Sequence, residues 1–268
     1  MPGLVLLGAN HDVAPLNVRE KLAVSRAEVG SILSKLSTST QVREVFILST
    51  KHRTEVYLRG PSSALDDIRL FWQERAGTSL EDLQPFLYEK RDGEAVCHLF
   101  ALGAGLDSLA VGQSPALAQI KEALDAAREA GTIGGYLDAL LNRAIKVSKK
   151  TLRENGQSTD PAQVEKTREM LRLETERFIR WTRSQRATRA IGAMEQRAEE
   201  IRRAELLKME GKLRHLSPEE REALEALTAS IVDKLLHTPK KALKGAASLE
   251  DASDYLRAAA ELFDLDDP

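Results

Sequence analysis

One segment of seven residues brings together several side chains that could take part in chemistry. Residues 49–55 read Ser-Thr-Lys-His-Arg-Thr-Glu. A lysine such as Lys51 can act as an amine nucleophile or a general base when burial lowers its pKa. His52 offers an imidazole, a common metal ligand, and Arg53 can pair with a carboxylate in two-pronged geometry. The segment therefore predicts a site built from an amine, an imidazole and a guanidinium.

The neighbouring residues predict how this segment is held. Residues 45–48 and 54–58 are rich in β-forming side chains, so we expect the segment to lie on a turn between two strands. Gly60 and Pro61 end the second strand. Residues 4–7 form a short apolar run that predicts another buried strand. The pattern up to Tyr88 is typical of an α+β domain.

The rest of the chain, from Asp92 onward, has the apolar spacing of helices. Asp160 and Pro161 predict the start of a long helix, with an N-cap acceptor and a proline at the first helical position, and we expect it to run to about Leu213. Residues 217–220 read Ser-Pro-Glu-Glu, a capping box that predicts the start of the next helix. The fold expected is an α+β N-terminal domain, a long connecting helix and an all-helical C-terminal domain.

Composition narrows the classes of protein. Apolar residues make up 42% of the 268 residues, and the formal net charge is −2. Aromatic residues make up 4%, which argues against a protein that grips single-stranded nucleic acid by stacking. The single cysteine, Cys97, excludes an internal disulfide framework. Because no run of 18 apolar residues occurs, we expect a cytoplasmic protein that makes no use of a membrane.

Several motifs in order give the chain a family resemblance. Residues 49–55 resemble the active-site segment Ser-Thr-Cys-Asn-Arg-Thr-Glu of glutamyl-tRNA reductase, which opens five-carbon tetrapyrrole synthesis. Residues 8–15, Gly-Ala-Asn-His-Asp-Val-Ala-Pro, are similar to the family's Gly-Leu-Asn-His-Lys-Thr-Ala-Pro. Residues 98–100, 105–108 and 234–239 match its central and dimerisation motifs. The resemblance implies a former catalytic domain at residues 1–156 and a long helix with a dimerisation domain at residues 157–268.

Two parts that the family uses for catalysis are missing from the pattern. The family's cysteine takes the glutamyl group as a thioester, and Lys51 stands in its place; a protonated amine cannot make that bond. The family's NADPH-binding domain would fall between Arg153 and the dimerisation helix, yet Asn155 is followed within six residues by Pro161. No Gly-x-Gly-x-x-Gly occurs, so we expect no Rossmann domain and no NADPH site.

The resemblance also implies which residues line the former active site. His52 stands where the family has asparagine, and Cys97 where it usually has arginine, so both are gains. Imidazole and thiolate are usual ligands of zinc and haem iron, which makes His11, His52, Cys97 and His98 candidates for a divalent metal or haem. The alternative is an unliganded pocket. The implied pocket comprises Asn10, His11, Ser49, Lys51, His52, Arg53, His98, Asp107, Ser108, Gln113 and Gln119.

Three functions remain open at this point. The first is a non-catalytic relative that serves tetrapyrrole metabolism by binding glutamyl-tRNA, the true reductase or a pathway product. The second is a haem- or metal-binding protein that reuses the pocket, and the third is an enzyme with new chemistry at Lys51. In each case we expect a homodimer built through residues beyond Pro161. Two apolar faces are expected to form it: a strip of Val164, Leu171, Phe178 and Trp181, and a second face of Leu224, Leu227, Ile231, Leu235 and Leu236.

Overall fold

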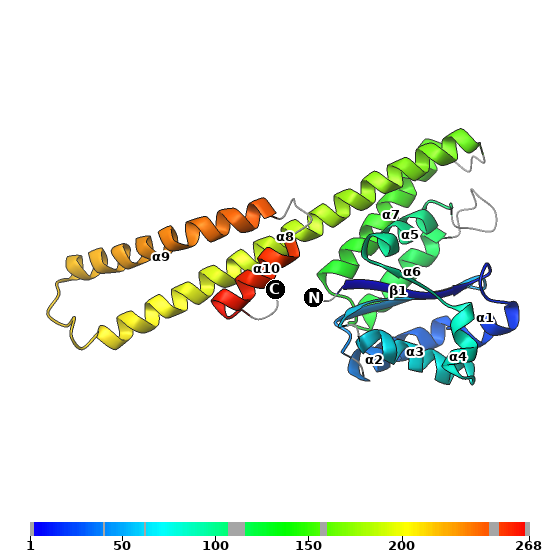
Figure 1. The fold of residues 1–268 in the computed structure, drawn as a ribbon, viewed down its shortest axis with the longest axis horizontal. Helices are drawn as coiled ribbons and strands as arrows, with labels where there is room; N and C mark the ends of the chain where they lie inside the picture. Colours follow the sequence, from blue (N-terminus) through cyan, green and yellow to red (C-terminus); the bar gives the residue numbers. More distant parts are fainter. Residues whose placement is uncertain are drawn as a thin grey trace. The chain divides into compact units, whose positions relative to one another are not determined.

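A four-stranded antiparallel sheet organises the first part of the described chain (Figure 1). The computed structural model describes residues 3–39, 41–61, 63–106, 116–155, 160–246 and 252–265. The strands lie in the order β2-β3-β1-β4. They are β1 (Gly3–Asn10), β2 (Glu44–Ser49), β3 (Arg53–Gly60) and β4 (Tyr88–Arg91). The predicted α+β domain is confirmed.

The register of the strands places the seven-residue segment at one end of the sheet. Asn10 of β1 pairs with Arg53 of β3, and Ser49 of β2 pairs with Thr54. The turn between β2 and β3 therefore lies beside the end of β1, as the β-rich flanks predicted. Almost every residue of β1, β2 and β3 is buried, so both faces of the sheet are covered.

Helices cover the two faces in two groups. In Figure 1, α2, α3 and α4 lie on one side of the sheet, and α5, α6 and α7 lie on the other. The bounds are α1 (Leu16–Leu22), α2 (Arg26–Ser39), α3 (Ser63–Ala76), α4 (Leu80–Leu83), a 3-10 turn (Gln84–Phe86), α5 (Asp92–Gly103), α6 (Ala116–Glu129) and α7 (Gly135–Asn155).

A buried carboxylate joins the sheet to α7. Glu44, at the start of β2, accepts hydrogen bonds from the backbone nitrogens of Gly134 (3.0 Å) and Leu137 (2.7 Å). Gly134 directly precedes α7 and Leu137 lies in its first turn, where helix N–H groups have no helical partner. Arg59 donates to the other oxygen at 3.0 Å, and its guanidinium lies 4.2 Å from the centre of the Tyr136 ring. Glu44 thus caps α7 from a distant position in the sequence.

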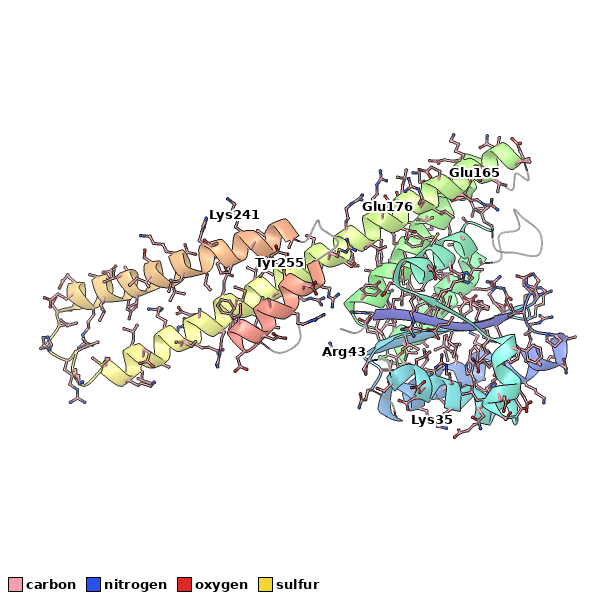
Figure 2. The ribbon with its side chains drawn as sticks, viewed as in Figure 1. Lys35, Arg43, Glu165, Glu176, Lys241 and Tyr255 are labelled. Carbon is pink, nitrogen blue, oxygen red and sulfur yellow. The ribbon has the colours of Figure 1, made fainter. Side chains whose placement is uncertain are left out.

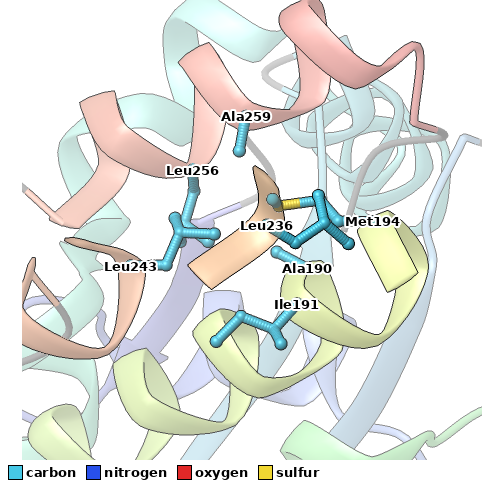
Figure 3. Packing of buried hydrophobic residues seen from close by; sticks show 7 residues of the cluster. All are labelled: Ala190, Ile191, Met194, Leu236, Leu243, Leu256 and Ala259. Carbon is cyan, nitrogen blue, oxygen red and sulfur yellow. The ribbon is translucent and has the colours of Figure 1, made fainter. Parts of the chain in front are cut away.

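The second part of the chain is helical. It consists of α8 (Pro161–Met209), α9 (Pro218–Ala246) and α10 (Ala252–Phe263). Buried apolar side chains from all three helices form one cluster, shown in Figure 3. Its buried members are Ala190, Ile191, Met194, Leu236, Leu243, Leu256 and Ala259. Leu256 and Ala259 belong to α10.

The sequence signals for helix starts are confirmed at two places. The backbone nitrogen of Ala162 donates to Asp160 Oδ1 (3.3 Å) at the start of α8. At α9, the nitrogen of Ser217 donates to Glu220 Oε2 (2.8 Å) and the nitrogen of Glu220 donates to Ser217 Oγ (3.2 Å), which is a capping box. The end of α8 at Met209 falls short of the expected Leu213. Pro239 lies inside α9, which continues through it.

Two compact units, Met1–Arg177 and Phe178–Pro268, meet inside α8. The sequence motifs instead predict a boundary at residue 156. The compact units and the predicted domains therefore have different boundaries. The first turns of α8 belong to the first unit, where Glu174 accepts a hydrogen bond from Arg143 of α7 at 2.5 Å. Charged residues such as Lys35, Glu165 and Lys241 are exposed (Figure 2).

The apolar strip predicted for α8 needs a correction. Leu171 and Phe178 are 2% and 3% exposed in the single chain, so they have no surface left for a second copy. Trp181 is 43% exposed. Spacing along a helix identifies an apolar face but does not say which neighbour covers it. No helix in the described ranges is both long and apolar enough to cross a membrane.

We predict that Glu44→Ala destabilises the first unit. The change leaves the backbone N–H groups of Gly134 and Leu137 and the guanidinium of Arg59 without this acceptor, a loss of about 2–4 kcal/mol. Urea unfolding followed by circular dichroism measures it, with Glu129→Ala, an exposed carboxylate of α6, as the control. Equal unfolding midpoints for the two variants would show that Glu44 has no such role.

Candidate functional site

The turn between β2 and β3 is held by the side chain of Thr50 and by Arg19 of α1. Thr50 Oγ1 accepts hydrogen bonds from the backbone nitrogens of His52 (3.1 Å) and Arg53 (3.2 Å). Arg19 of α1 donates through Nη1 to the carbonyl oxygen of Lys51 (2.9 Å). Lys51 is exposed and His52 is half-buried. The turn therefore presents Lys51 to solvent on a fixed backbone.

The end of β1 places a second histidine beside this turn. Asn10 is buried, and its Oδ1 accepts from the backbone nitrogens of Asp12 (3.1 Å) and Val13 (3.3 Å). This turn holds His11 so that its ring centre lies 6.3 Å from that of His52, edge to face. His11 Nε2 lies 3.3 Å from Asp12 Oδ1, whereas its Nδ1 is buried with no hydrogen-bond partner.

His52 is surrounded by positive charge. Burial lowers the pKa of His52, and the nearby charges of Lys51, Arg19, His11 and Arg53 lower it further. Its ordinary value is 6.5, so at pH 7 the imidazole is neutral. A neutral imidazole can donate one hydrogen bond and accept another.

The most buried charge of the site is Glu55, which is fully buried in β3. Four side chains donate to it. Oε1 accepts from Arg53 Nη1 (3.0 Å), the Tyr88 hydroxyl (2.5 Å) and His98 Nε2 (2.8 Å), and Oε2 accepts from the Tyr57 hydroxyl (2.9 Å). These donors come from β3, β4 and α5. Glu55 thus ties three elements together behind the turn.

The donors keep Glu55 ionised. Burial raises the pKa of Glu55, but the hydrogen bond and charge of His98, the charge of Arg53 and the hydrogen bond of Tyr88 outweigh it and lower the pKa to about 2. An ionised carboxylate only accepts hydrogen bonds. His98 Nε2 must therefore carry the hydrogen, which fixes the role of that nitrogen.

Two tyrosines complete the cluster. Tyr57 stacks on Phe46 with ring centres 4.5 Å apart, and burial followed by the charge of Glu55 raises its pKa well above the usual value. Tyr88 reaches Glu55 because β1 has a glycine at the crossing point. A Cβ on Gly8 would lie 2.7 Å from the Tyr88 ring. Gly8 therefore permits the contact through its lack of a side chain.

The residues of the implied pocket are distributed over two places. Asn10, His11, Lys51, His52 and Arg53 meet at the turn, and His98 joins them through Glu55. Ser49 and Gln119 instead line a cavity of about 470 Å³ between α2, β2 and α6. Ser49 Oγ accepts from the nitrogen of Val24 (2.9 Å). The predicted residues Asp107, Ser108 and Gln113 lie outside the described residues.

The metal or haem site stays a prediction. Within the described ranges, no three or more histidine, cysteine, aspartate or glutamate side chains form a group that could hold a metal ion. His98 Nε2 is engaged by Glu55, so an incoming iron or zinc would have to displace that contact or bind Nδ1. Cys97 is a half-buried free cysteine next to it on α5.

Sequence reasoning missed Glu55, Tyr57 and Tyr88 as parts of the site. The available signal was a carboxylate within β3, between Thr54 and Val56, where both faces of the strand are covered. A buried charge needs partners, and that need points to donors elsewhere. Nothing in the order of residues shows that Tyr88 and His98 are those donors.

We predict that Glu55→Gln destabilises the first unit by about 2–4 kcal/mol at pH 7 because it leaves Arg53 without its buried counter-charge. The pKa of Glu55 is lowered on folding, so its contribution is complete above about 4.5 and is lost as pH falls towards 2. The gap between the urea midpoints of the two proteins should therefore stay constant from pH 7 to about pH 4.5 and narrow as pH falls to 3.5. Glu94→Gln, an exposed carboxylate of α5, is the control, and a constant gap across this range would contradict the prediction.

Comparison with known proteins gives the chain's relationships. Residues 7–155 match the model described as Glutamyl-tRNAGlu reductase, N-terminal domain, and residues 166–265 match Glutamyl-tRNAGlu reductase, dimerisation domain. Glutamyl-tRNA reductase of Halorhodospira halophila is 36% identical over 161 residues, which are 60% of this chain and 36% of that protein. The Shewanella pealeana reductase is 37% identical over 147 residues, 55% of this chain and 35% of that protein.

The chain therefore spans about a third of the length of these curated relatives. A solved structure, the glutamyl-tRNA reductase from Methanopyrus kandleri, has a TM-score of 0.64 and 16% identity, and the match covers 93% of this chain and 100% of that one. This likeness concerns the fold. Since the N-terminal family model alone covers more than half of the chain, the protein belongs to the glutamyl-tRNA reductase family.

Proposed function

We propose that this chain acts by binding, as a homodimeric member of its family that does not itself reduce glutamyl-tRNA. The observation that carries the proposal is Lys51, an exposed amine at the turn where the resemblance places the family's thiol. An ammonium group has no lone pair for attack at neutral pH, and an amine that did attack would form a stable amide instead of a thioester. Hydride transfer needs an acyl group as reactive as a thioester, and a stable amide is not one.

The chain length between the two family matches supports the same proposal. The matches end at residue 155 and resume at residue 166. A single βαβ unit, the smallest part of a dinucleotide fold, takes about 30 residues or more. Residues 156–165 are too few for such a unit. Glutamyl-tRNA, a full-length reductase and a tetrapyrrole product are the ligand classes that membership of this family suggests for a binding role.

The homodimer is supported by apolar surface on the second unit. A groove of about 710 Å³ lies between α8, α9 and α10. Leu227, Ile231 and Leu235 follow each other every four residues on α9 and are 59%, 49% and 71% exposed. Leu262 of α10 is 80% exposed. So much exposed apolar surface is typical of an interface. Of the two apolar faces expected from the sequence, the one on α9 is therefore the surface that we assign to the second copy.

We predict that neither this protein nor its Lys51→Cys variant forms glutamate semialdehyde from glutamyl-tRNA and NADPH. The cysteine variant can at most accept the glutamyl group as a thioester or release it by hydrolysis. The measurements are an aldehyde assay and mass spectrometry of the protein. Lys146→Cys, which places a thiol on an exposed position of α7, controls for non-specific acylation. NADPH-dependent aldehyde above background would refute the proposal.

We also predict that Leu235→Asp weakens the dimer at least tenfold, because it puts a charge into an apolar contact. Light scattering over a concentration series measures the dissociation constant. Lys241→Asp, on the same helix at an exposed polar position, should leave the dimer intact. A wild-type protein that is monomeric at micromolar concentration would remove the homodimer from the proposal.

A further inference from the structure

The strand at one edge of the sheet has backbone groups that face away from its neighbour. β2 lies at the edge, with β3 beside it. In an antiparallel pair, every second residue exchanges hydrogen bonds with the neighbouring strand, and the residues between them turn their N–H and C=O groups outward. The nitrogen of Thr50 donates to the carbonyl oxygen of Arg53 (2.8 Å), which sets the phase of this alternation. The backbone groups of Val45, Ile47 and Ser49 therefore face away from β3.

The chain itself occupies the first of these three outward positions. The nitrogen of Val45 donates to the carbonyl oxygen of Thr132 (2.8 Å), and the Thr132 hydroxyl donates to the carbonyl oxygen of Val45 (2.9 Å). Within the described ranges, the backbone N–H and C=O of Ile47 have no such partner, although Ile47 is only 2% exposed. Buried backbone groups are almost always paired in folded proteins. Position 47 of the edge therefore offers a donor and an acceptor to a partner.

Ile47 and Ser49 line the cavity of about 470 Å³ between α2 and α6. Small residues leave room there, because Gly30 of α2 and Ala123 and Ala126 of α6 line the same cavity. A Cβ atom on Gly30 would have no described atom within 4 Å outside the backbone of its own helix. The volume falls within the ~300–1,000 Å³ that ligand sites occupy. The outward edge of β2 thus forms part of the wall of a groove between two helices.

The mouth of this groove is acidic. Glu122 of α6 lies 3.9 Å from Arg26 of α2, and both side chains are more than half exposed. Asp125 and Glu129, one helical turn apart on α6, are exposed and belong to no ion pair in the part of the chain that the structure describes. Arg128 between them donates to an acidic side chain of α7 at 2.7 Å. Three carboxylates and one guanidinium among the lining residues leave an excess of two negative charges.

We infer that the outward edge of β2 binds an extended, positively charged peptide segment of a partner protein, which pairs with Ile47 as a fifth strand of the four-stranded sheet. Addition of a strand to an open sheet edge is a general mode of peptide recognition, in which main-chain hydrogen bonds give affinity and side chains give specificity. A lysine or arginine of the segment supplies the charge that Asp125 and Glu129 lack. The inference goes beyond the proposed function and does not depend on it.

Two features favour a peptide over a small molecule in this groove. The outward groups of Ile47 and Ser49 repeat at strand spacing, roughly 7 Å apart, which matches alternate residues of an extended chain. A small amide is long enough for only one of these positions. In addition, Thr132 already pairs with the same edge at Val45 through its backbone oxygen and its hydroxyl. The edge therefore accepts main-chain partners from outside the strands.

The probe is the peptide Gly-Val-Lys-Val-Gly, blocked at both ends, and isothermal titration calorimetry with the full chain measures its dissociation constant. N-methylation gives two further forms, one methylated at both valines and one at the lysine. Only residues that face β2 use their N–H groups in the ladder, so the two forms should differ about tenfold in affinity. Replacement of the lysine by glutamate should weaken binding about fivefold. Equal affinities of the two methylated forms, or no binding of the parent peptide, overturn the inference.

A pair of protein variants tests the groove. Gly30→Leu places a side chain where the peptide lies and should weaken binding about tenfold. Gly192→Leu makes the same change in α8, at a helical glycine that likewise has open space at its Cβ position, and should keep the wild-type dissociation constant. An equal loss of affinity in the two variants contradicts the proposed site.

Amide hydrogen exchange followed by NMR locates the bound peptide. Without peptide, the N–H of Ile47 should exchange faster than those of Phe46 and Leu48, which bond to β3. With the peptide bound, exchange at Ile47 should slow about tenfold while exchange at Phe46 and Leu48 stays the same. A peptide that binds without slowing exchange at Ile47 lies elsewhere, and that result refutes strand addition at β2.

Discussion

The ionised carboxylate of Glu55 is the constraint on which the rest of the first unit depends. It is fully buried, and a buried charge is tolerated only with several partners. Arg53, Tyr57, Tyr88 and His98 supply them from two strands and a helix. To meet this need, the Tyr88 side chain of β4 crosses the neighbouring strand β1, which in turn requires a glycine at position 8. The position of His98 in the site follows from the same requirement.

The site therefore has two layers with different freedom to change. The inner layer consists of Glu55 and its donors, where any substitution leaves a buried polar group without a partner. The outer layer is the turn at Lys51 and His52, whose backbone is held by Thr50 and Arg19 through main-chain atoms. Because those contacts do not involve the side chains at positions 51 and 52, they can form with other residues there, except proline at position 52, which would lack the donating N–H. New chemistry at the surface is compatible with an unchanged scaffold.

Sequence patterns predicted the elements better than the contacts between them. The β-rich flanks located the turn, and the capping residues located the starts of α8 and α9, since these signals act over a few residues. Leu171 shows the limit, because its spacing on a helix is the same whether one chain or two bury it. The partners of Glu55 show it again, since Tyr88 and His98 are distant in sequence and the contact passes over Gly8. Contacts between polar groups that are distant in the chain produce no periodic pattern in the sequence.

Pro239 sets a condition on the apolar surface of α9. Proline has no backbone N–H, so the carbonyl of Leu235 loses the donor that a helix normally provides one turn later. Leu235 is one of the most exposed leucines of that surface. The carbonyl oxygen of Leu235 is thus a polar atom at the edge of an otherwise apolar surface. A helix packed against α9 can donate a hydrogen bond to this oxygen in some alignments and not in others. This carbonyl oxygen therefore favours some alignments of a second helix along α9 over others that bury the same area.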